Sequence, residues 1–401
     1  MFDMESRHII EALRSGVPSR TVGRCFSEAR PKIMREVSES LSRTAEEEIS
    51  SGMVISGKYG EGKTHLLNTV FSMAHSQNMV VSWLTLSKET PMDKLYLVYQ
   101  KIAAETYLPG HRQPGFFSEL DQITAGSPLG QDLLLYCATR LQTDKLYYVL
   151  KAYFGTEDPE EKFQLLSDLE GDFIAPGTLK KMYRRIYNET ARIKQPFSKT
   201  KNCGDYYFFL SYLFRRMGYS GWVILVDETE LIGRLGKKAR LKAYQNMAFF
   251  LMPQEELEST FSMFALSASY EEDVIEAKHE YENLAQVFPE AQEPARSILD
   301  IMCAAPQLLP LTRDEVMEVI TRVMDYHAKA YDWTPSVTAE TLMNASMSSG
   351  FLLRTRIRSA IEQLDQLYQY GDTGEITIGK LETDSYDVPE LEMSQSDAKH
   401  E

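Results

Sequence analysis

Hydrophobic positions along the chain repeat in two different ways, which separate predicted helices from predicted strands. Spacings of three and four residues, as at Ile9, Ile10 and Leu13, are typical of amphipathic helices. They predict helices over residues 6–16, 27–44, 63–75, 313–331, 337–347 and 352–370. Short, mainly apolar runs are typical of buried strands in a parallel sheet. Such runs occur at residues 53–56, 79–84, 222–226 and 261–266, with a weaker one at 307–311.

The order of these elements predicts an α/β fold built on a parallel sheet. Residues 91–216 show helical periodicity and no convincing strand, so about 108–216 is predicted to be a large helical insertion. The expected units are an N-terminal helical segment, the core with its insertion, a small helical lid and an acidic, disordered tail, at residues 1–50, 51–312, 313–375 and 376–401.

Composition and charge narrow the class of protein. Among 401 residues, 43% are hydrophobic and 25% are charged, which is ordinary for a globular protein. Forty-three basic and 58 acidic residues give a net charge of −15, which disfavours general binding to nucleic acid. The four cysteines are widely spaced, so neither a zinc site nor a disulfide framework is predicted. With no signal-peptide pattern and no long apolar run, we expect a cytoplasmic protein with no membrane partner.

A glycine-rich segment between a predicted strand and a predicted helix carries the strongest chemical signal. Residues 57–64, here called the glycine loop, read GKYGEGKT and match G-x-x-x-x-G-K-[ST] at every fixed position. Glycines allow backbone N–H groups to surround phosphates, Lys63 would reach the β- and γ-phosphates, and Thr64 would ligate Mg²⁺. ATP and Mg²⁺ are therefore the predicted ligands. The predicted nucleotide-binding residues here are Gly57, Tyr59, Gly60, Glu61, Gly62, Lys63, Thr64 and His65.

Two carboxylates follow the apolar run at 222–226. Asp227 would hold the metal together with Thr64, and Glu228 would polarise the attacking water of an ATPase. The structural alternative is that Asp227 merely starts a turn after the strand. A small-molecule kinase also uses such a loop, but no acceptor site is visible in the sequence.

Several polar and basic residues are candidates for sensing the γ-phosphate. Ser267 and Ser269 follow the run at 261–266, next to the acidic strand, although polar residues also end strands without any function. Three arginines, Arg354, Arg356 and Arg358, begin the last predicted helix, and Arg354 is the first choice for a lid sensor over a solvated basic face. Candidates for an arginine supplied to a neighbouring subunit are Arg234, Arg240 and Arg296.

The predicted insertion contains a local reversal of charge. Eight basic residues and one acidic residue, Glu189, lie between positions 180 and 201, with Tyr183 and Tyr187 among them. This stretch would suit the backbone of double-stranded DNA. The alternative is a solvated helix that faces acidic surface elsewhere.

Four segments resemble the motifs of the BREX-system ATP-binding proteins: residues 11–18, 57–67, 227–230 and 354–365. The first is similar to an amino-terminal "LRxGvP" signature, the third to a D-E-x-E motif, and Leu353 stands where the family commonly has proline. More distantly, the layout resembles the origin-recognition and STAND branches of AAA+ ATPases. The resemblance implies an AAA+-like P-loop ATPase of an anti-phage defence system, with other defence proteins and copies of itself as partners. It also implies that Arg14, Val17 and Pro18 line the adenine pocket.

Two functions remain open at this point. An ATPase motor or loader, acting on DNA or partner proteins, is favoured by Glu228 beside Asp227. A nucleotide-gated switch or scaffold that recruits other defence components, with little turnover, is favoured by the acidic composition and the large helical insertion.

Overall fold

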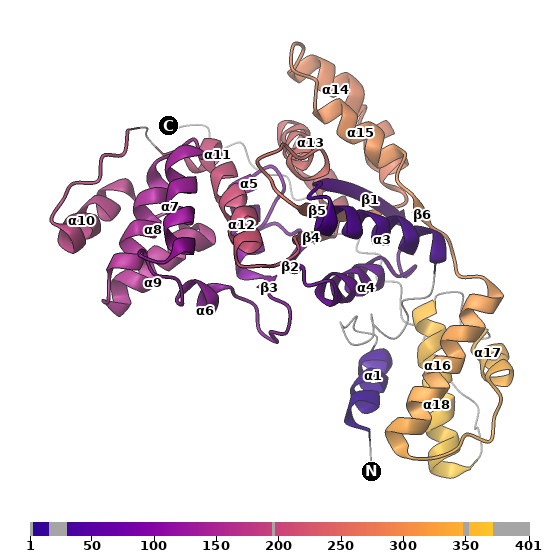
Figure 1. Ribbon diagram of the computed structural model, residues 1–401. Helices are drawn as coiled ribbons and strands as arrows, with labels where there is room; N and C mark the ends of the chain where they lie inside the picture. Colours follow the sequence, from indigo (N-terminus) through magenta and orange to yellow (C-terminus); the bar gives the residue numbers. More distant parts are fainter. Residues whose placement is uncertain (1–2, 16–29, 195–196, 348–352, 372–401) are drawn as a thin grey trace.

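A six-stranded sheet lies at the centre of the computed structural model, which describes residues 3–15, 30–194, 197–347 and 353–371 (Figure 1). The strands are β1 (Ser51–Gly57), β2 (Val80–Thr85), β3 (Thr106–Tyr107), β4 (Trp222–Asp227), β5 (Thr260–Ser267) and β6 (Gln307–Leu308). Their order is β3-β2-β4-β5-β1-β6, and every pairing is parallel except that of β2 with β3. The sequence prediction of a mainly parallel α/β sheet is therefore confirmed.

Two predictions about strands need correction. The prediction that residues 91–216 contain no strand is wrong at β3, which has only two residues and too short a pattern to be recognised. The weak strand predicted at 307–311 ends at Leu308, since Leu309 is 67% exposed and Pro310 has no N–H to donate to a neighbouring strand.

Side chains of the central strands alternate between two apolar layers. In β4, Val223 and Leu225 face one layer, whereas Ile224 and Val226 face the other. The first layer is covered by α3 (Pro31–Glu46) and α4 (Lys63–Ser76), and the second by α5 (Leu95–Ala104), α12 (Gly204–Arg216), α13 (Lys237–Leu251) and α15 (Ala295–Cys303). Because both faces are covered, all six residues of β4 are buried, which explains its unbroken apolar run.

Between β3 and β4 the described chain forms helices joined by loops, without a strand, and these helices extend to one side of the sheet (Figure 1). They are α6 (Phe117–Leu120), α7 (Pro128–Thr139), α8 (Lys145–Gly155), α9 (Pro159–Ser167), the π-helix η1 (Asp168–Asp172), α10 (Pro176–Tyr187), α11 (Lys199–Asn202) and α12. A fully buried ion pair joins two of them, since Lys145 Nζ lies 2.5 Å from Asp168 Oδ2. The Tyr206 hydroxyl of α12 donates to the other carboxylate oxygen at 2.6 Å.

Further short helices connect β4, β5 and β6. They are the 3₁₀ helix η2 (Thr229–Arg234), the π-helix η3 (Glu271–Glu276) and α14 (Glu280–Val287), which precedes α15. Within the described residues, no helix is both long enough and apolar enough to cross a membrane.

The C-terminal helices α16 (Arg313–Tyr331), α17 (Ala339–Met347) and α18 (Leu353–Tyr370), here called the lid, share a separate apolar core with α1 (Met4–Ser15). Ile9, Ile10 and Leu13 of α1 supply the N-terminal part of this core. Thr312 and Glu315 form a reciprocal capping box at the start of α16. The predicted tail, residues 376–401, lies outside the described residues.

Candidate functional site

The glycine loop connects the end of β1 to the start of α4. Gly60 and Gly62 have φ angles of 79° and 91°, in the left-handed region where glycine is favoured. Among the described residues no side chain caps the N-terminus of α4, and a helix start of this kind can bind an anion through its backbone N–H groups. The Glu61 carboxylate instead accepts the Lys58 N–H at 2.7 Å, which holds the turn closed. The positive φ angles and the uncapped start of α4 fit the predicted phosphate-binding role of this loop, which stays a prediction.

Lys63 and Thr64 begin α4 and point to neighbouring strand ends. Lys63 Nζ donates to the Gly57 carbonyl at 3.0 Å, across the loop. Thr64 Oγ1 donates to Asp227 Oδ2 at 2.8 Å, although β5 separates β4, which ends at Asp227, from β1, which leads into the glycine loop. The other oxygen of the buried Asp227 accepts the Glu228 N–H at 2.9 Å. The structure therefore brings together the two residues predicted to hold the metal.

A hydroxyl and a carboxylate oxygen suit Mg²⁺, which keeps several waters and takes few protein ligands when it binds a nucleotide. The parts of the chain that the structure describes contain no group of three or more His, Cys, Asp or Glu able to hold a metal. Thr64 and Asp227 fit a Mg²⁺ that takes its remaining ligands from phosphate and water.

Two further carboxylates follow Asp227. Glu228 has a φ of 58° and an exposed side chain, and partial desolvation, together with the charges of Glu230 and Asp227, raises its pKa. Glu230 lies two residues further, in the first turn of η2, and is partly buried. Burial raises the pKa of Glu230, whereas its own N–H and the charge of Lys63 act in the opposite direction. Its Oε2 is buried without a hydrogen-bond partner among the described residues.

Glu230 is thus a residue of this site to which the sequence analysis gave no role. The D-E-x-E pattern contained the signal, because its second glutamate lies two residues beyond the predicted base. The backbone N–H of Ser267 also lowers the pKa of Glu230, which places this glutamate against the end of β5.

Ser267 ends β5 and pairs in register with Gly57 of β1. Its hydroxyl lies 3.2 Å from that of Ser269, and the next residue, Ala268, donates its N–H to the Gly57 carbonyl at 3.1 Å. Ser267 therefore lies beside Gly57, where the glycine loop begins, and its contact with the γ-phosphate stays a prediction. The choice between Ser267 and Ser269 as sensor stays open.

Arg14 binds the lid. Its Nη2 donates to both Asp365 oxygens at 2.9 Å and to the Tyr331 hydroxyl at 3.1 Å, and Nη1 contacts Glu11. The buried His327 lies 3.0 Å from the same carboxylate. These contacts fix α1 to α16 and α18. An adenine contact by Arg14 stays a prediction, while Val17 and Pro18 lie outside the described residues.

The remaining arginine candidates differ in exposure to solvent and in whether they already form an ion pair. Arg354 is exposed on the first turn of α18, and no hydrogen bond or ion pair in the described structure ties it to the glycine loop. Arg240 is buried and bound to Glu280 through Nε at 2.8 Å and Nη2 at 2.6 Å. Arg234 and Arg296 are exposed, and Arg234 is near enough to Glu228 to affect its pKa. Of these candidates for an arginine supplied to a neighbouring subunit, two are thus exposed and one is held in a buried ion pair, and the supply itself stays a prediction.

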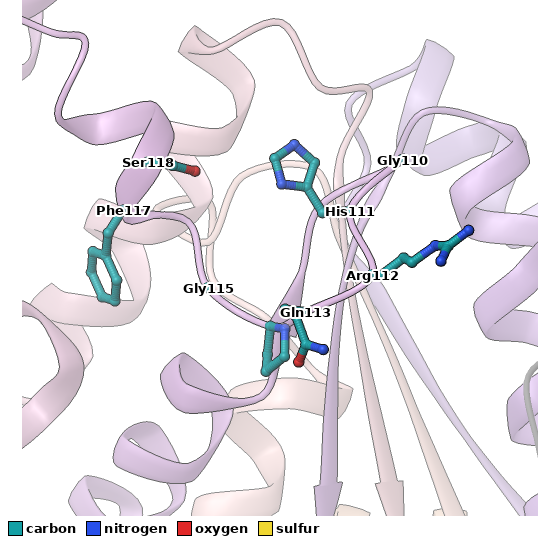
Figure 2. Close-up of a pocket in the computed structure, with 8 residues that line it drawn as sticks. Gly110, His111, Arg112, Gln113, Gly115, Phe117 and Ser118 are labelled. Carbon is teal, nitrogen blue, oxygen red and sulfur yellow. The ribbon is translucent and has the colours of Figure 1, made fainter.

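A hollow of about 530 Å³ lies elsewhere, in the loop after β3 (Figure 2). The His111, Arg112 and Gln113 side chains project from this loop in different directions rather than toward one centre (Figure 2). Tyr107 pairs with Val81 near the start of β2, whereas Asp227 pairs with the far end of that strand. The hollow therefore lies away from the glycine loop and is not part of its site.

The predicted basic stretch is exposed along α10. This helix carries no acidic residue, and Lys180, Lys181 and Arg184 are exposed with no ion pair among the described residues. Arg185 is different, because it pairs with Glu161 of α9. One cation of α10 thus faces an acid and three face solvent, and DNA binding by this stretch stays a prediction.

Comparison with protein families gives one match. A family model described as BREX system ATP-binding protein BrxC/D matches residues 3–120 and 155–377. The matched segments include the glycine loop, Asp227 and the lid, and they leave out residues 121–154 of the helical insertion. Neither a curated protein nor a solved structure gives a match.

Proposed function

The chain belongs to the family of BREX system ATP-binding proteins BrxC/D, and on this premise we propose that it is an AAA+-like P-loop ATPase that works as a motor or loader on DNA or on partner proteins of the defence system. The observation that carries the proposal is the hydrogen bond between Thr64 and Asp227. It brings a predicted metal ligand of the glycine loop to the acidic end of β4, beside Lys63. Such convergence is what phosphoryl transfer to water requires.

Each residue then has a part in hydrolysis. The backbone N–H groups of the glycine loop and the Lys63 ammonium bind the phosphates, and Ser267 contacts the terminal one. Mg²⁺ held by Thr64 and Asp227 would neutralise phosphate charge. Glu228 takes a proton from water as the water oxygen bonds to the γ-phosphorus and the bond to the β–γ bridging oxygen breaks, which gives ADP and phosphate. Its raised pKa makes Glu228 a better proton acceptor than an ordinary glutamate.

We further propose a homo-oligomer, in which an exposed arginine such as Arg234 or Arg296 reaches the nucleotide of the neighbouring subunit. The chain would act in the cytoplasm. Arg354 of the lid would report the presence of the phosphates.

A second candidate function is a nucleotide-gated switch or scaffold. The observation that favours it is the fixed contact between Arg14 and Asp365, which makes α1 and the lid one packed unit that can move together. In this function bound ATP holds a conformation that recruits other defence components, and hydrolysis only resets it.

The test is ATP turnover by the wild type and by Glu228→Gln, with and without double-stranded DNA. The ATPase proposal expects turnover by the wild type, retained ATP binding with little turnover by the variant, and a rate that DNA or a partner changes. Tight ATP binding with negligible turnover under every condition would favour the switch instead. Phosphate transferred to an acceptor rather than to water would overturn both.

A further inference from the structure

Arg30 lies between the glycine loop and the lid. It precedes α3, with a φ of 67° and ψ of 58°, and its Nη2 donates to the Glu61 carbonyl of the loop at 2.5 Å. Its backbone N–H acts on the Glu315 carboxylate, where it helps to lower the pKa of that capping residue of α16. One residue thus contacts both the loop and the first turn of the lid.

The guanidinium of Arg30 is not satisfied by these contacts. Its Nη1 is buried and has no hydrogen-bond partner among the described residues. The Glu61 carboxylate accepts the Lys58 N–H and that of Glu315 accepts the Thr312 N–H, both at 2.7 Å, and neither accepts from Nη1. Their charges act against burial, which lowers the pKa of Arg30, but they leave this donor without a hydrogen bond. A buried cationic donor without a partner is costly, so it calls for an acceptor that the described residues do not supply.

The chemistry of the loop identifies that acceptor. The two terminal nitrogens of a guanidinium belong to one rigid plane, so the anchored Nη2 keeps Nη1 near Glu61. A phosphate group is the strongest anionic acceptor expected at this loop, and arginine binds phosphate well through its planar donors.

We propose that Arg30 is a further nucleotide-binding residue, which donates from Nη1 to a phosphate oxygen of bound nucleoside triphosphate. It thereby couples the glycine loop to the lid. This inference rests on the proposed nucleotide site. With the nucleotide bound, the guanidinium is fixed at both nitrogens, and the backbone of Arg30 holds Glu315 at the start of α16. Loss of the nucleotide frees one nitrogen and loosens that connection.

The experiment compares Mg-ATP binding by the full chain with that of Arg30→Met and Arg30→Lys. The first variant keeps much of the side-chain stem but no donor, and the second keeps the charge. Arg35→Met, at an exposed position on α3, is the matched control. Hydrogen exchange of residues 312–316 gives a second readout, at the start of the lid.

We expect Arg30→Met to weaken Mg-ATP binding about tenfold or more and to abolish the ATP-dependent protection of residues 312–316. Arg30→Lys should recover part of both effects, and Arg35→Met should change neither. Wild-type affinity in Arg30→Met would overturn this inference and leave the proposed function intact. A wild type that binds no ATP would overturn the proposed function and this inference with it.

Discussion

Thr64 Oγ1 donates to Asp227 Oδ2 over 2.8 Å, and this contact joins two residues that are 163 positions apart in the chain. The contact exists because β4 and β1 run parallel on either side of β5, so that their carboxyl ends meet at one edge of the sheet. The same edge carries Lys63 and Ser267.

Removing the Asp227 charge tests whether this contact marks a metal site. Asp227→Asn keeps the size of the side chain and an oxygen for Thr64, but it lacks the charge that attracts Mg²⁺. We expect turnover to fall about 10–100-fold and the Mg²⁺ concentration for half-maximal rate to rise. Asp132→Asn, on the surface of the insertion, is the control and should match the wild type. An unchanged Mg²⁺ dependence in Asp227→Asn would contradict the assignment.

The contribution of Glu230 to the stability of the protein should depend on pH. Burial raises its pKa above the ordinary value of 4.5, so the folded protein binds this proton more readily than the unfolded chain does. The free energy of unfolding therefore falls as the pH rises from the unfolded pKa to the folded pKa. The full cost of the ionised side chain is present above the folded pKa and absent below the unfolded pKa. We expect Glu230→Gln to be more stable than the wild type at about pH 7.5, with the difference shrinking as the pH falls through the window above 4.5.

Denaturant midpoints measured at several pH values check this prediction. Glu228→Gln is the comparison, because its side chain is exposed and should give a smaller change in stability. Loss of stability in Glu230→Gln at neutral pH would mean that its Oε2 has a partner in solution.

The buried ion pair between Lys145 and Asp168 allows a prediction that concerns only the stability of the protein. Lys145 and Asp168 are both fully buried, and desolvation lowers the pKa of Lys145 and raises that of Asp168. Lys145→Met leaves the carboxylate without its counter-ion, so we expect a loss of about 3–5 kcal/mol in the free energy of unfolding. The double variant Lys145→Met/Asp168→Leu should lose less, because no uncompensated charge remains.

Urea unfolding of the insertion, followed by tyrosine fluorescence, gives this measurement. Lys162→Met is the matched control, since Lys162 pairs with Asp121 at 3.1 Å but is partly exposed. A surface pair of that kind should contribute no more than about 1 kcal/mol. Equal losses in Lys145→Met and Lys162→Met would contradict the role of burial.

The sequence predicted those parts of the fold and site whose pattern is local. The unbroken apolar run of β4 and the glycine spacing of the loop depend on neighbouring residues, and both are found where expected. The two-residue β3 escaped notice because its pairing with β2 comes from the sheet edge and not from its own pattern.

Contacts between segments that are far apart in the sequence are harder to predict from it. Arg14 was placed at the adenine by resemblance, and only the packing of α1 on the lid reveals its bond to Asp365. The sequence assigns no role to Arg30 or Glu230, because one charged residue in a sequence does not show whether it will be buried or which donor or acceptor will lack a partner.

The exposed cations of α10 allow the DNA-acting form of the proposed function to be tested directly. Lys180, Lys181 and Arg184 face solvent without an ion pair in the described structure, so each can contact one phosphate. We expect the triple change of these residues to glutamine to weaken binding to double-stranded DNA. Because each lost phosphate contact removes about 0.9 from the slope of log affinity against log salt, the slope should fall by roughly 3.

The slope of log affinity against log salt makes this test specific. A folding defect would weaken DNA binding without removing a fixed number of phosphate contacts. The control is Lys238→Gln with Lys242→Gln, two exposed lysines of α13 that lie outside the insertion. They should leave both affinity and slope near the wild-type values. If the control lowers the slope as much as the α10 variant does, DNA binding depends on positive charge anywhere on the surface and not on specific contacts with α10. If neither variant changes binding, the basic stretch is a solvated helix face, and the partner of this ATP-binding protein should be sought among proteins.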